Sequence, residues 1–486
     1  MAIVNFNEST LSNGLVTPAQ SKVTLASAYL DIRSSGWAQQ YLPDLYEAEV
    51  ERYGDRSISG FLGMVGAEMP MSSDQVIWSE QGRLHLAYKA TLNTTNGAVS
   101  DPKDIDNESG ANIAMAVREN QTVVCQVTDG SAVVVVKGQI VGAPAADGST
   151  CTIRPYGYNN FSDIPNISGT AKTIRFFVYG SDIKKGQPGL GGGVEAEFKS
   201  FKNKPMIIKD EYQINGSDAA AIGWVEVSGE AGQSGYLWYL KSSGDTEKRF
   251  EDYLEMSMME AENVVGNGVT GTGSEGLFAA LENRGLIASS GILDGGSSGN
   301  PATADDLSDF DILLQELDKQ GGISENMMFL DRASALNMDD MLAGVNAHTA
   351  GTTNYGVFNN SEDMALNLGF SGFRRASYDF YKTDWKYLNN KSTRYLVNNG
   401  ATVGKIKGVL VPAGTTTVYD ENMGKNIRRP FLHVRYRASQ ADDRKLKKWT
   451  TGSVGAATSD LDAMKVHYLS ERCLVTQGAN NFVLFR

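Results

Sequence analysis

Apolar residues recur at helical spacing most clearly in residues 245–265 of this chain. The spacing places Phe250, Tyr253, Leu254, Met258, Ala261 and Val265 on one face, and glutamates occupy the opposite face. Asp245 is expected to cap the start of this helix, and Gly266 is expected to end it. The pattern therefore predicts one long amphipathic helix near the middle of the chain.

Three shorter helices are predicted on either side of the long one. Residues 41–53 carry apolar side chains on one helical face. Residues 303–322 show the same pattern, with Thr303 and Asp306 spaced as a capping box. A further helix is expected to begin at Asp331, whose side chain would cap it.

Alternating and β-branched apolar runs predict strands before the long helix. Residues 75–92 and 197–214 are interpreted as the outgoing and returning arms of one long hairpin. Between them, residues 117–179 contain short apolar runs separated by Gly, Asp and Asn turns, which predict a small all-β insertion. The glycine-rich residues 184–196 are typical of a flexible return linker.

After the long helix, the pattern mixes helices and strands and then becomes mostly β. The predicted strands cover 327–330, 394–399, 405–414, 415–420, 429–439, 465–478 and 480–485. The fold class expected from this order is α+β. At the other end, residues 1–35 are polar and are interpreted as an extended arm that needs another surface to order it.

Length, charge and cysteine content narrow the class of protein. A chain of 486 residues exceeds what one hydrophobic core usually serves, so several domains are expected. The net charge of -13 argues against a general nucleic-acid-binding surface, which needs clustered Lys and Arg. Cys125, Cys151 and Cys473 have no CxxC spacing and are expected to be free thiols. The sequence shows neither a secretion signal nor a membrane span, which favours a cytoplasmic protein.

No compact catalytic motif is present in the sequence. Residues 266–271 and 271–276 match GxGxxG, but they follow a helix, whereas dinucleotide binding needs the motif between a strand and a helix. The four histidines have no carboxylate or cysteine at ligand spacing: His85, His348, His433 and His467. We therefore predict no catalytic residue, no cofactor and no metal site.

Basic residues concentrate near the C-terminus, which is unusual in so acidic a chain. This basic cluster consists of Lys425, Arg428, Arg429, Arg435, Arg437, Arg444, Lys445, Lys447 and Lys448. Two interpretations stay open. The cluster forms salt bridges to acidic surfaces of the same or a neighbouring subunit, or it contacts DNA by neutralising phosphates without reading bases.

Three segments of the sequence carry a resemblance to a known family: EFKSFKNKPMIIKDEYQI at 197–214, GTGSEGLFAALENRG at 271–285 and DFYKTDWKYLNN at 379–390. Together with the order of the parts, they resemble the major capsid proteins of tailed bacteriophages, which have the HK97-type fold. That order is an arm, a short helix, an extended β-loop, a spine helix, a mixed α/β domain and closing strands. The resemblance covers most of the chain apart from the β insertion.

The resemblance implies a fold with five parts along the chain. They are an N-terminal arm with a short helix at 1–55, an extended loop at 56–92 and 194–233, an all-β insertion domain at 93–193, a peripheral domain with the spine helix and closing strands at 234–278 and 441–486, and an axial α/β domain at 279–440. The arm and the extended loop would reach neighbouring subunits, and the insertion would project outward or bridge capsomers.

The resemblance also implies a function. The chain would be a structural virion protein that self-assembles into the hexamers and pentamers of an icosahedral head around double-stranded DNA. Its partners would be copies of itself, portal, scaffold and auxiliary or decoration proteins, and packaged DNA bound non-specifically, with no membrane. It would assemble in the host cytoplasm and reside in the virion. Some members of this class cross-link a loop lysine to an asparagine of a neighbour, and Lys89 lies in the corresponding region. The large insertion suggests a large-genome lineage such as the crAss-like phages.

Two other classes of protein stay open. A β-rich virion surface protein or adhesin would explain the insertion, but it should show repeats or a solvent-facing aromatic platform, and no fixed-period repeat is found. An enzyme with a dispersed active site would leave no linear motif. Purification as a monomer with a bound small molecule would favour the enzyme, whereas hexamers or shell-like particles would favour the capsid protein.

Overall fold

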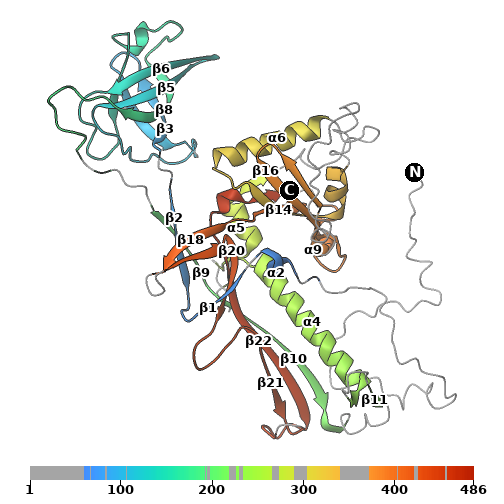
Figure 1. The fold of residues 1–486 in the computed structure, drawn as a ribbon. Coiled ribbons are helices and arrows are strands. Elements are labelled where there is room, and N and C mark those ends of the chain that lie inside the picture. The colour runs from blue at the N-terminus through green and yellow to red at the C-terminus, as the bar shows by residue number, and fades with distance from the viewer. Residues whose placement is uncertain are drawn as a thin grey trace. The chain divides into compact units, whose positions relative to one another are not determined.

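A computed structural model gives the fold of the chain (Figure 1). It describes residues 58, 60–65, 67–82, 85–105, 107–191, 193, 198–217, 226–228, 234–264, 273–288, 304–339, 371–401, 403–420, 425–454 and 457–486. The predicted arm at 1–35, the predicted helix at 41–53 and the capping residue Thr303 lie outside these residues. The fold is mixed α and β, mostly β-sheet with few helices, and it divides into two compact units.

One unit, Ser79–Phe201, is built on a closed antiparallel barrel whose strands pair in the order β3-β4-β7-β6-β5-β8. The strands are β3 (Ala87–Asn93), β4 (Ala98–Asp104), β5 (Gln121–Asp129), β6 (Ala132–Ile140), β7 (Cys151–Pro155) and β8 (Ala171–Ser181). Strand alternation turns Val123, Cys125 and Val127 of β5 inward, where they are fully buried. A barrel this small has its interior filled by side chains. The barrel agrees with the all-β prediction for residues 117–179.

The other unit, Met1–Trp78 with Lys202–Arg486, contains two main sheets. The first is five-stranded: β1 (Glu68–Met71), β20 (Leu432–Arg437), β22 (Ala463–Thr476), β10 (Met206–Asn215) and β21 (Lys447–Gly452). The long strand β22 pairs with β10 along one edge and with β20 and β21 along the other. Helix α4 (Leu237–Glu260) packs on one face of this sheet, where Phe250 lies 5.7 Å from the ring of Tyr468.

The second sheet has six strands in the order β13-β23-β17-β14-β16-β15. Their bounds are β13 (Leu286–Ala288), β23 (Val483–Phe485), β17 (Gly408–Pro412), β14 (Glu325–Leu330), β16 (Tyr378–Asp384) and β15 (Ser371–Arg375). Helix α6 (Ala304–Lys319) covers the face that carries Leu410, and α5 (Leu277–Arg284) covers the face that carries Val409 and Val411. Because both faces are buried, the central strands β14, β17 and β23 carry continuous apolar runs in the sequence.

The remaining described elements are short. Three two-stranded sheets pair β2 (Val76–Gln81) with β9 (Phe198–Asn203), β11 (Glu226–Ser228) with β12 (Ser234–Tyr236), and β18 (Thr415–Asp420) with β19 (Lys425–Pro430). The short helices are α2 (Phe61–Val65), η2 (Phe161–Asp163), α9 (Lys386–Asn389), α10 (Arg394–Asn398) and η3 (Ala479–Asn481). Residues 332–339 are helical, and the Asp331 side chain accepts a hydrogen bond from the Ser334 N–H at 2.8 Å, as predicted for its cap.

The predicted bounds of the long helix are wrong at both ends. It begins at Leu237, so Asp245 lies inside it, and it ends at Glu260, so Ala261 lies just beyond it. Val265 and Gly266 lie outside the described residues. The chain leaves the helix early because the Gly276 N–H donates to the Ala261 carbonyl at 2.8 Å. A Cβ at Gly276 would come within 2.8 Å of the Ala261 backbone, so this close approach needs glycine.

The predicted strand at 394–399 is also wrong, because this segment contains helix α10. The Asn398 side chain donates to the Ile406 carbonyl at 2.8 Å and accepts from the Ile406 N–H at 3.1 Å. The Thr393 hydroxyl donates to the Tyr387 carbonyl at 2.5 Å. These local bonds fix a short helix despite the β-branched and aromatic residues.

The two predicted hairpin arms pair with each other only where β2 meets β9. The rest of the outgoing arm is β3 of the barrel, and the rest of the returning arm is β10, which pairs with β22. Strands β19 and β21 are not among the predictions, because they are mostly basic and polar. The pairings of β2 with β9 and of β10 with β22 join segments that are distant in the sequence.

Candidate functional site

Members of the basic cluster lie beside one edge of strand β22. Arg435 and Arg437 belong to β20, Lys447 and Lys448 belong to β21, and both strands pair with β22. Arg444 and Lys445 lie in the connection between β20 and β21. The side chains of Lys425, Arg428 and Arg429, on β19, lie outside the described part of the structure. The described members of the cluster therefore lie along one edge of β22, opposite the edge that pairs with β10.

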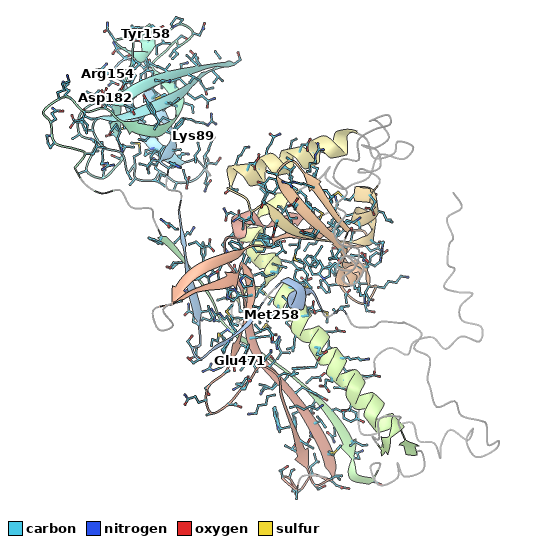
Figure 2. All side chains as sticks on the ribbon, in the orientation of Figure 1. Lys89, Arg154, Tyr158, Asp182, Met258 and Glu471 are labelled. Atoms are coloured by element: carbon cyan, nitrogen blue, oxygen red, sulfur yellow. The ribbon has the colours of Figure 1, made fainter. Side chains whose placement is uncertain are left out.

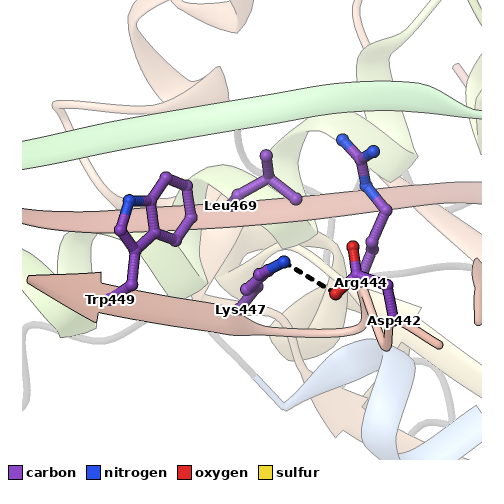
Figure 3. A pocket seen from close by; sticks show the side chains of 5 residues that line it. All are labelled: Asp442, Arg444, Lys447, Trp449 and Leu469. Carbon is purple, nitrogen blue, oxygen red and sulfur yellow. Dashed lines mark hydrogen bonds and ion pairs between the residues drawn. The ribbon is translucent and has the colours of Figure 1, made fainter.

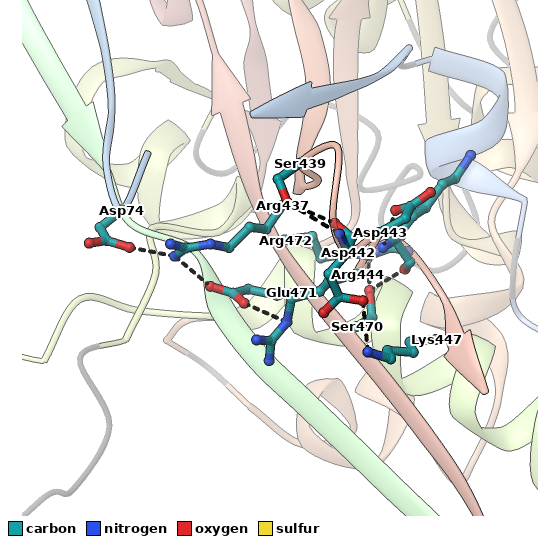
Figure 4. A network of polar contacts seen from close by, with 11 residues as sticks. Asp74, Arg437, Ser439, Asp442, Asp443, Arg444, Lys447, Ser470, Glu471 and Arg472 are labelled. Atoms are coloured by element: carbon teal, nitrogen blue, oxygen red, sulfur yellow. Dashed lines mark hydrogen bonds and ion pairs between the residues drawn. The ribbon is translucent and has the colours of Figure 1, made fainter. Parts of the chain in front are cut away.

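The centre of this site is Glu471 of β22, which is 4% exposed. Its carboxylate accepts from Arg437 Nη1 at 3.2 Å and forms an ion pair with Arg444 Nε at 2.9 Å (Figure 4). Arg437 also pairs with Asp74, and the Asp74 and Glu471 carboxylates raise the pKa of Arg437. A buried carboxylate needs such partners, because burial without them is costly.

The neighbouring residue Arg472 is buried and faces the other side of the strand. Its Nε donates to Ser470 Oγ at 2.8 Å, and its Nη2 donates to the Lys445 carbonyl at 2.8 Å. Its Nη1 lies 3.3 Å from Glu68, which also pairs with Lys445. Sequence reasoning missed Arg472, Glu471 and Glu68, because no local pattern distinguishes them from other charged residues.

The remaining basic side chains in the described part of the cluster also have partners. Lys447 pairs with Asp442 at 2.7 Å. Lys448 pairs with Glu247 of helix α4 at 2.9 Å and lies 5.2 Å above the ring of Tyr468. Arg435 Nη1 lies 3.5 Å from the Pro70 carbonyl. These contacts lie within one chain, and the choice between salt bridges and DNA contact stays a prediction.

A small pocket opens beside this network. It is lined by Asp442, Arg444, Lys447, Trp449 and Leu469, and its volume is about 260 Å³ (Figure 3). Trp449 stacks on His467 with ring centroids 5.1 Å apart, and His467 Nε2 lies 2.7 Å from the Thr451 hydroxyl. Ligand pockets usually reach ~300–1,000 Å³, so this one is small for a small-molecule ligand.

The second set of predicted site residues is the packing face of the long helix. Phe250, Leu254 and Met258 are buried, whereas Tyr253 is 42% exposed. Phe250 and Leu254 pack against the five-stranded sheet, and Met258 packs into the core beside α5. Ala261, beyond the end of the helix, is half-buried.

Helix α4 also carries two carboxylates that bind the backbone at the start of α2. Glu255 is buried and accepts from the Gly60 N–H at 2.8 Å and from the Phe61 N–H at 2.7 Å. Asp252 accepts from the Ile58 N–H at 3.0 Å. Burial raises the pKa of Glu255 to about 7, although the backbone N–H groups oppose this shift. The sequence signal for this contact was only an acidic helix face.

Chemistry-bearing side chains are otherwise dispersed. Among the described residues, no three His, Cys, Asp or Glu side chains cluster closely enough to hold a metal ion. Cys125, Cys151 and Cys473 are free and buried, as predicted, and burial raises the pKa of each thiol to about 12. No helix in the described ranges combines the length and apolar composition needed to cross a membrane.

Lys89 lies on β3 of the barrel, where it pairs with Glu108 at 2.9 Å. Glu108 also accepts from Arg175 Nε at 2.6 Å and from Nη2 at 2.7 Å. Arg175 is the main cause of the lowered pKa of Glu108, about 2. A lysine held by this ion pair is poorly placed to cross-link.

Comparison with known proteins gives distant structural likenesses. No protein-family model matches the chain, and no curated protein matches it. A solved structure from Mycobacterium phage Bobi is 8% identical with a TM-score of 0.37, covering 94% of this chain and 98% of its own. One from Gordonia phage Cozz is 10% identical with a TM-score of 0.37, covering 96% and 98%. The capsid of an empty GTA particle is 8% identical with a TM-score of 0.34, covering 93% and 98%. These likenesses are too distant to assign a function.

Proposed function

We propose that this chain is a major capsid protein of a tailed bacteriophage, with an HK97-type arrangement of its parts. Copies of it assemble into hexamers and pentamers of an icosahedral head that encloses double-stranded DNA. Its place is the virion, after assembly in the host cytoplasm. It acts as a structural protein and not as an enzyme.

The observation that carries this proposal is the exposure of large apolar side chains on a two-stranded ribbon. On the two-stranded ribbon β2-β9, Ile77 is 65% exposed and Phe198 is 64% exposed. A two-stranded ribbon cannot form a core of its own. Contiguous exposed apolar patches mark surfaces that other protein covers, and we infer such a surface on this ribbon.

A second set of exposed apolar residues lies at and after helix α10. Leu396, Val397 and Val403 are all exposed there. One chain that presents two separate apolar surfaces can contact more than one neighbouring copy, as a closed shell requires. Many weak contacts of this kind add up, because each one raises the effective concentration for the next.

The proposed parts follow the boundaries implied by the resemblance. The ribbon β2-β9 belongs to the extended loop, α4 is the spine helix, and α6 with five strands of the six-stranded sheet belongs to the axial domain, while the sixth strand, β23, comes from the closing segment 441–486. Portal, scaffold and auxiliary or decoration proteins are proposed as further partners. Packaged DNA is proposed as a non-specific partner of the basic cluster, and the DNA content of particles carrying Arg428→Gln and Arg429→Gln would test it.

The test of the main proposal is the assembly state of the purified chain, expressed alone and with its neighbouring structural genes. Size-exclusion chromatography and negative-stain imaging should show hexamers, tubes or closed shells. A homogeneous monomer under both conditions would contradict the proposal. A bound small molecule in such a monomer would favour an enzyme instead.

A further inference from the structure

The barrel presents exposed aromatic rings on its outer face. On β8, Ile174 and Phe176 turn inward, and alternation turns Phe177 outward. The turn after β7 adds two more rings. The aromatic platform consists of Tyr156, Tyr158, Phe177 and Tyr179, which are between 45% and 51% exposed. Figure 2 shows Tyr158 on this barrel, together with Arg154 and Asp182.

Contacts between strands hold parts of this platform in place. The Tyr156 N–H donates to the Lys137 carbonyl at 2.9 Å, which fixes the turn to β6. Gln139 Nε2 donates to the Asp182 carbonyl at 2.8 Å. Arg154 lies opposite Gln139 in the strand register, and Gln139 binds the Asp182 carbonyl, so Tyr156, two residues after Arg154, lies near Asp182. Burial raises the pKa of Tyr156, and Tyr179 and Asp182 raise it further. A platform that is already ordered loses little entropy on binding.

Polar side chains lie beside the rings. Arg154, opposite Gln139 in the strand register, donates from Nη1 to the Asn159 carbonyl at 3.2 Å and to Asn160 Oδ1 at 2.5 Å. These bonds orient its guanidinium and leave its other N–H groups for a ligand. Asp182 is exposed beside Tyr156. The site thus combines flat apolar rings with a fixed donor and an acceptor.

Three classes of ligand could cover these rings: single-stranded nucleic acid, another protein or a sugar. The charge and composition of the site discriminate between them. Single-stranded nucleic acid needs a positively charged groove, but residues 79–201 contain eleven Lys and Arg against twelve Asp and Glu. The nearby Arg175 and Lys172 are paired with Glu108 and Asp129. Aspartate is depleted from the core of a protein interface, whereas tyrosine and arginine are enriched there, so Asp182 is the side chain of this site that argues against a protein partner.

We propose that the aromatic platform binds a neutral oligosaccharide. The rings offer flat apolar faces to the C–H faces of sugar rings, and Arg154 and Asp182 hydrogen-bond to neighbouring hydroxyls. Barrel surfaces of this size are used for oligosaccharides in other folds. All residues of this site belong to the unit Ser79–Phe201, so the proposal does not depend on the proposed capsid function.

The experiment is isothermal titration of the full chain, in its soluble form, with four neutral probes: cellohexaose, maltohexaose, mannohexaose and chitohexaose. At least one should bind, and the double variant Tyr156→Ala with Tyr179→Ala should bind it at least tenfold more weakly. Tyr395→Ala removes an equally accessible tyrosine outside the barrel and should leave the affinity unchanged. Asp182→Asn should weaken binding without changing thermal unfolding.

Several results would overturn the proposal. One is the absence of binding to all four probes, and another is equal binding by the double variant. A change in oligomeric state alone, without sugar binding, would assign the platform to a second copy of the chain. Binding of hexadeoxythymidine in place of the sugars would assign it to nucleic acid.

Discussion

At the residue scale, five side chains of the basic cluster form ion pairs around β22 within one chain: Arg437, Arg444, Lys445, Lys447 and Lys448. The acidic partners Asp74, Glu68 and Glu247 come from segments distant in the sequence. Sequence reasoning located the basic residues and offered salt bridges as one interpretation. It could not name the partners, because they are set by strand pairing and by the position of helix α4.

Glu471→Gln should destabilise the subunit by about 1–2 kcal/mol in free energy of unfolding. The carboxylate is buried between Arg437 and Arg444, whose side chains are about one third exposed, so water compensates part of the loss. Urea unfolding at pH 7 measures the change. Asp74→Asn is the matched control, since Asp74 is almost fully exposed and its loss should cost less than about 0.5 kcal/mol. Equal effects of both variants would contradict this account.

Glu255 should make the stability of the subunit depend on pH near neutrality. Its pKa is about 7 in the folded chain and about 4.5 in the unfolded chain, so the folded state holds the proton more tightly. Its contribution to stability is therefore complete below about pH 4.5 and is lost as the pH rises through 7. The loss is about 1.4 kcal/mol for each unit of pKa difference.

Urea unfolding between pH 5 and 8 would test the role of Glu255. Glu255→Gln should remove most of this pH dependence, because the glutamine does not titrate. Glu251→Gln, which changes an exposed glutamate of the same helix, should leave the dependence as it is. A slope that persists in Glu255→Gln would assign the titration to another group.

At the scale of elements, the sequence predicted best where burial on both faces or on one face leaves a clear pattern. The apolar runs of β14, β17 and β23 and the amphipathic α6 are examples. Helix α10 was mispredicted, because hydrogen bonds of Thr393 and Asn398 outweigh the strand-like side chains. The ends of α4 were mispredicted because apolar spacing continues past the point where Gly276 holds the chain.

The packing face of α4 gives a prediction at this scale. Phe250→Ala should lower the free energy of unfolding by about 3–5 kcal/mol, because Phe250 is fully buried against Tyr468. Tyr253→Ala, three residues along the same helix, should cost much less, because its side chain is exposed. Denaturant unfolding of both variants measures the difference. Comparable losses of unfolding free energy in the two variants would contradict this account, because they would mean that the Tyr253 side chain contributes as much to packing as Phe250 does.

At the scale of the whole molecule, the sequence predicted a β-rich region before the long helix and a mixed α and β region after it, but it did not predict the pairing of distant segments. Closure of the barrel depends on β3 meeting both β4 and β8, and no local pattern specifies this. The returning arm has the same alternating pattern whether it pairs with the outgoing arm or with β22. The sequence therefore predicted strands well and their neighbours poorly.

The exposed ribbon provides the prediction that separates assembly from folding. Phe198→Asp should abolish particles and hexamers while leaving the thermal unfolding of the subunit within about 0.5 kcal/mol, because the ring is mostly exposed in one chain. Size-exclusion chromatography and imaging measure assembly. Phe198→Leu keeps an apolar side chain and should assemble. Ile77→Asp should repeat the defect of Phe198→Asp from the partner strand. Normal particles from both aspartate variants would mean that no other copy covers the ribbon, and self-assembly would then have to depend on other surfaces such as that at α10.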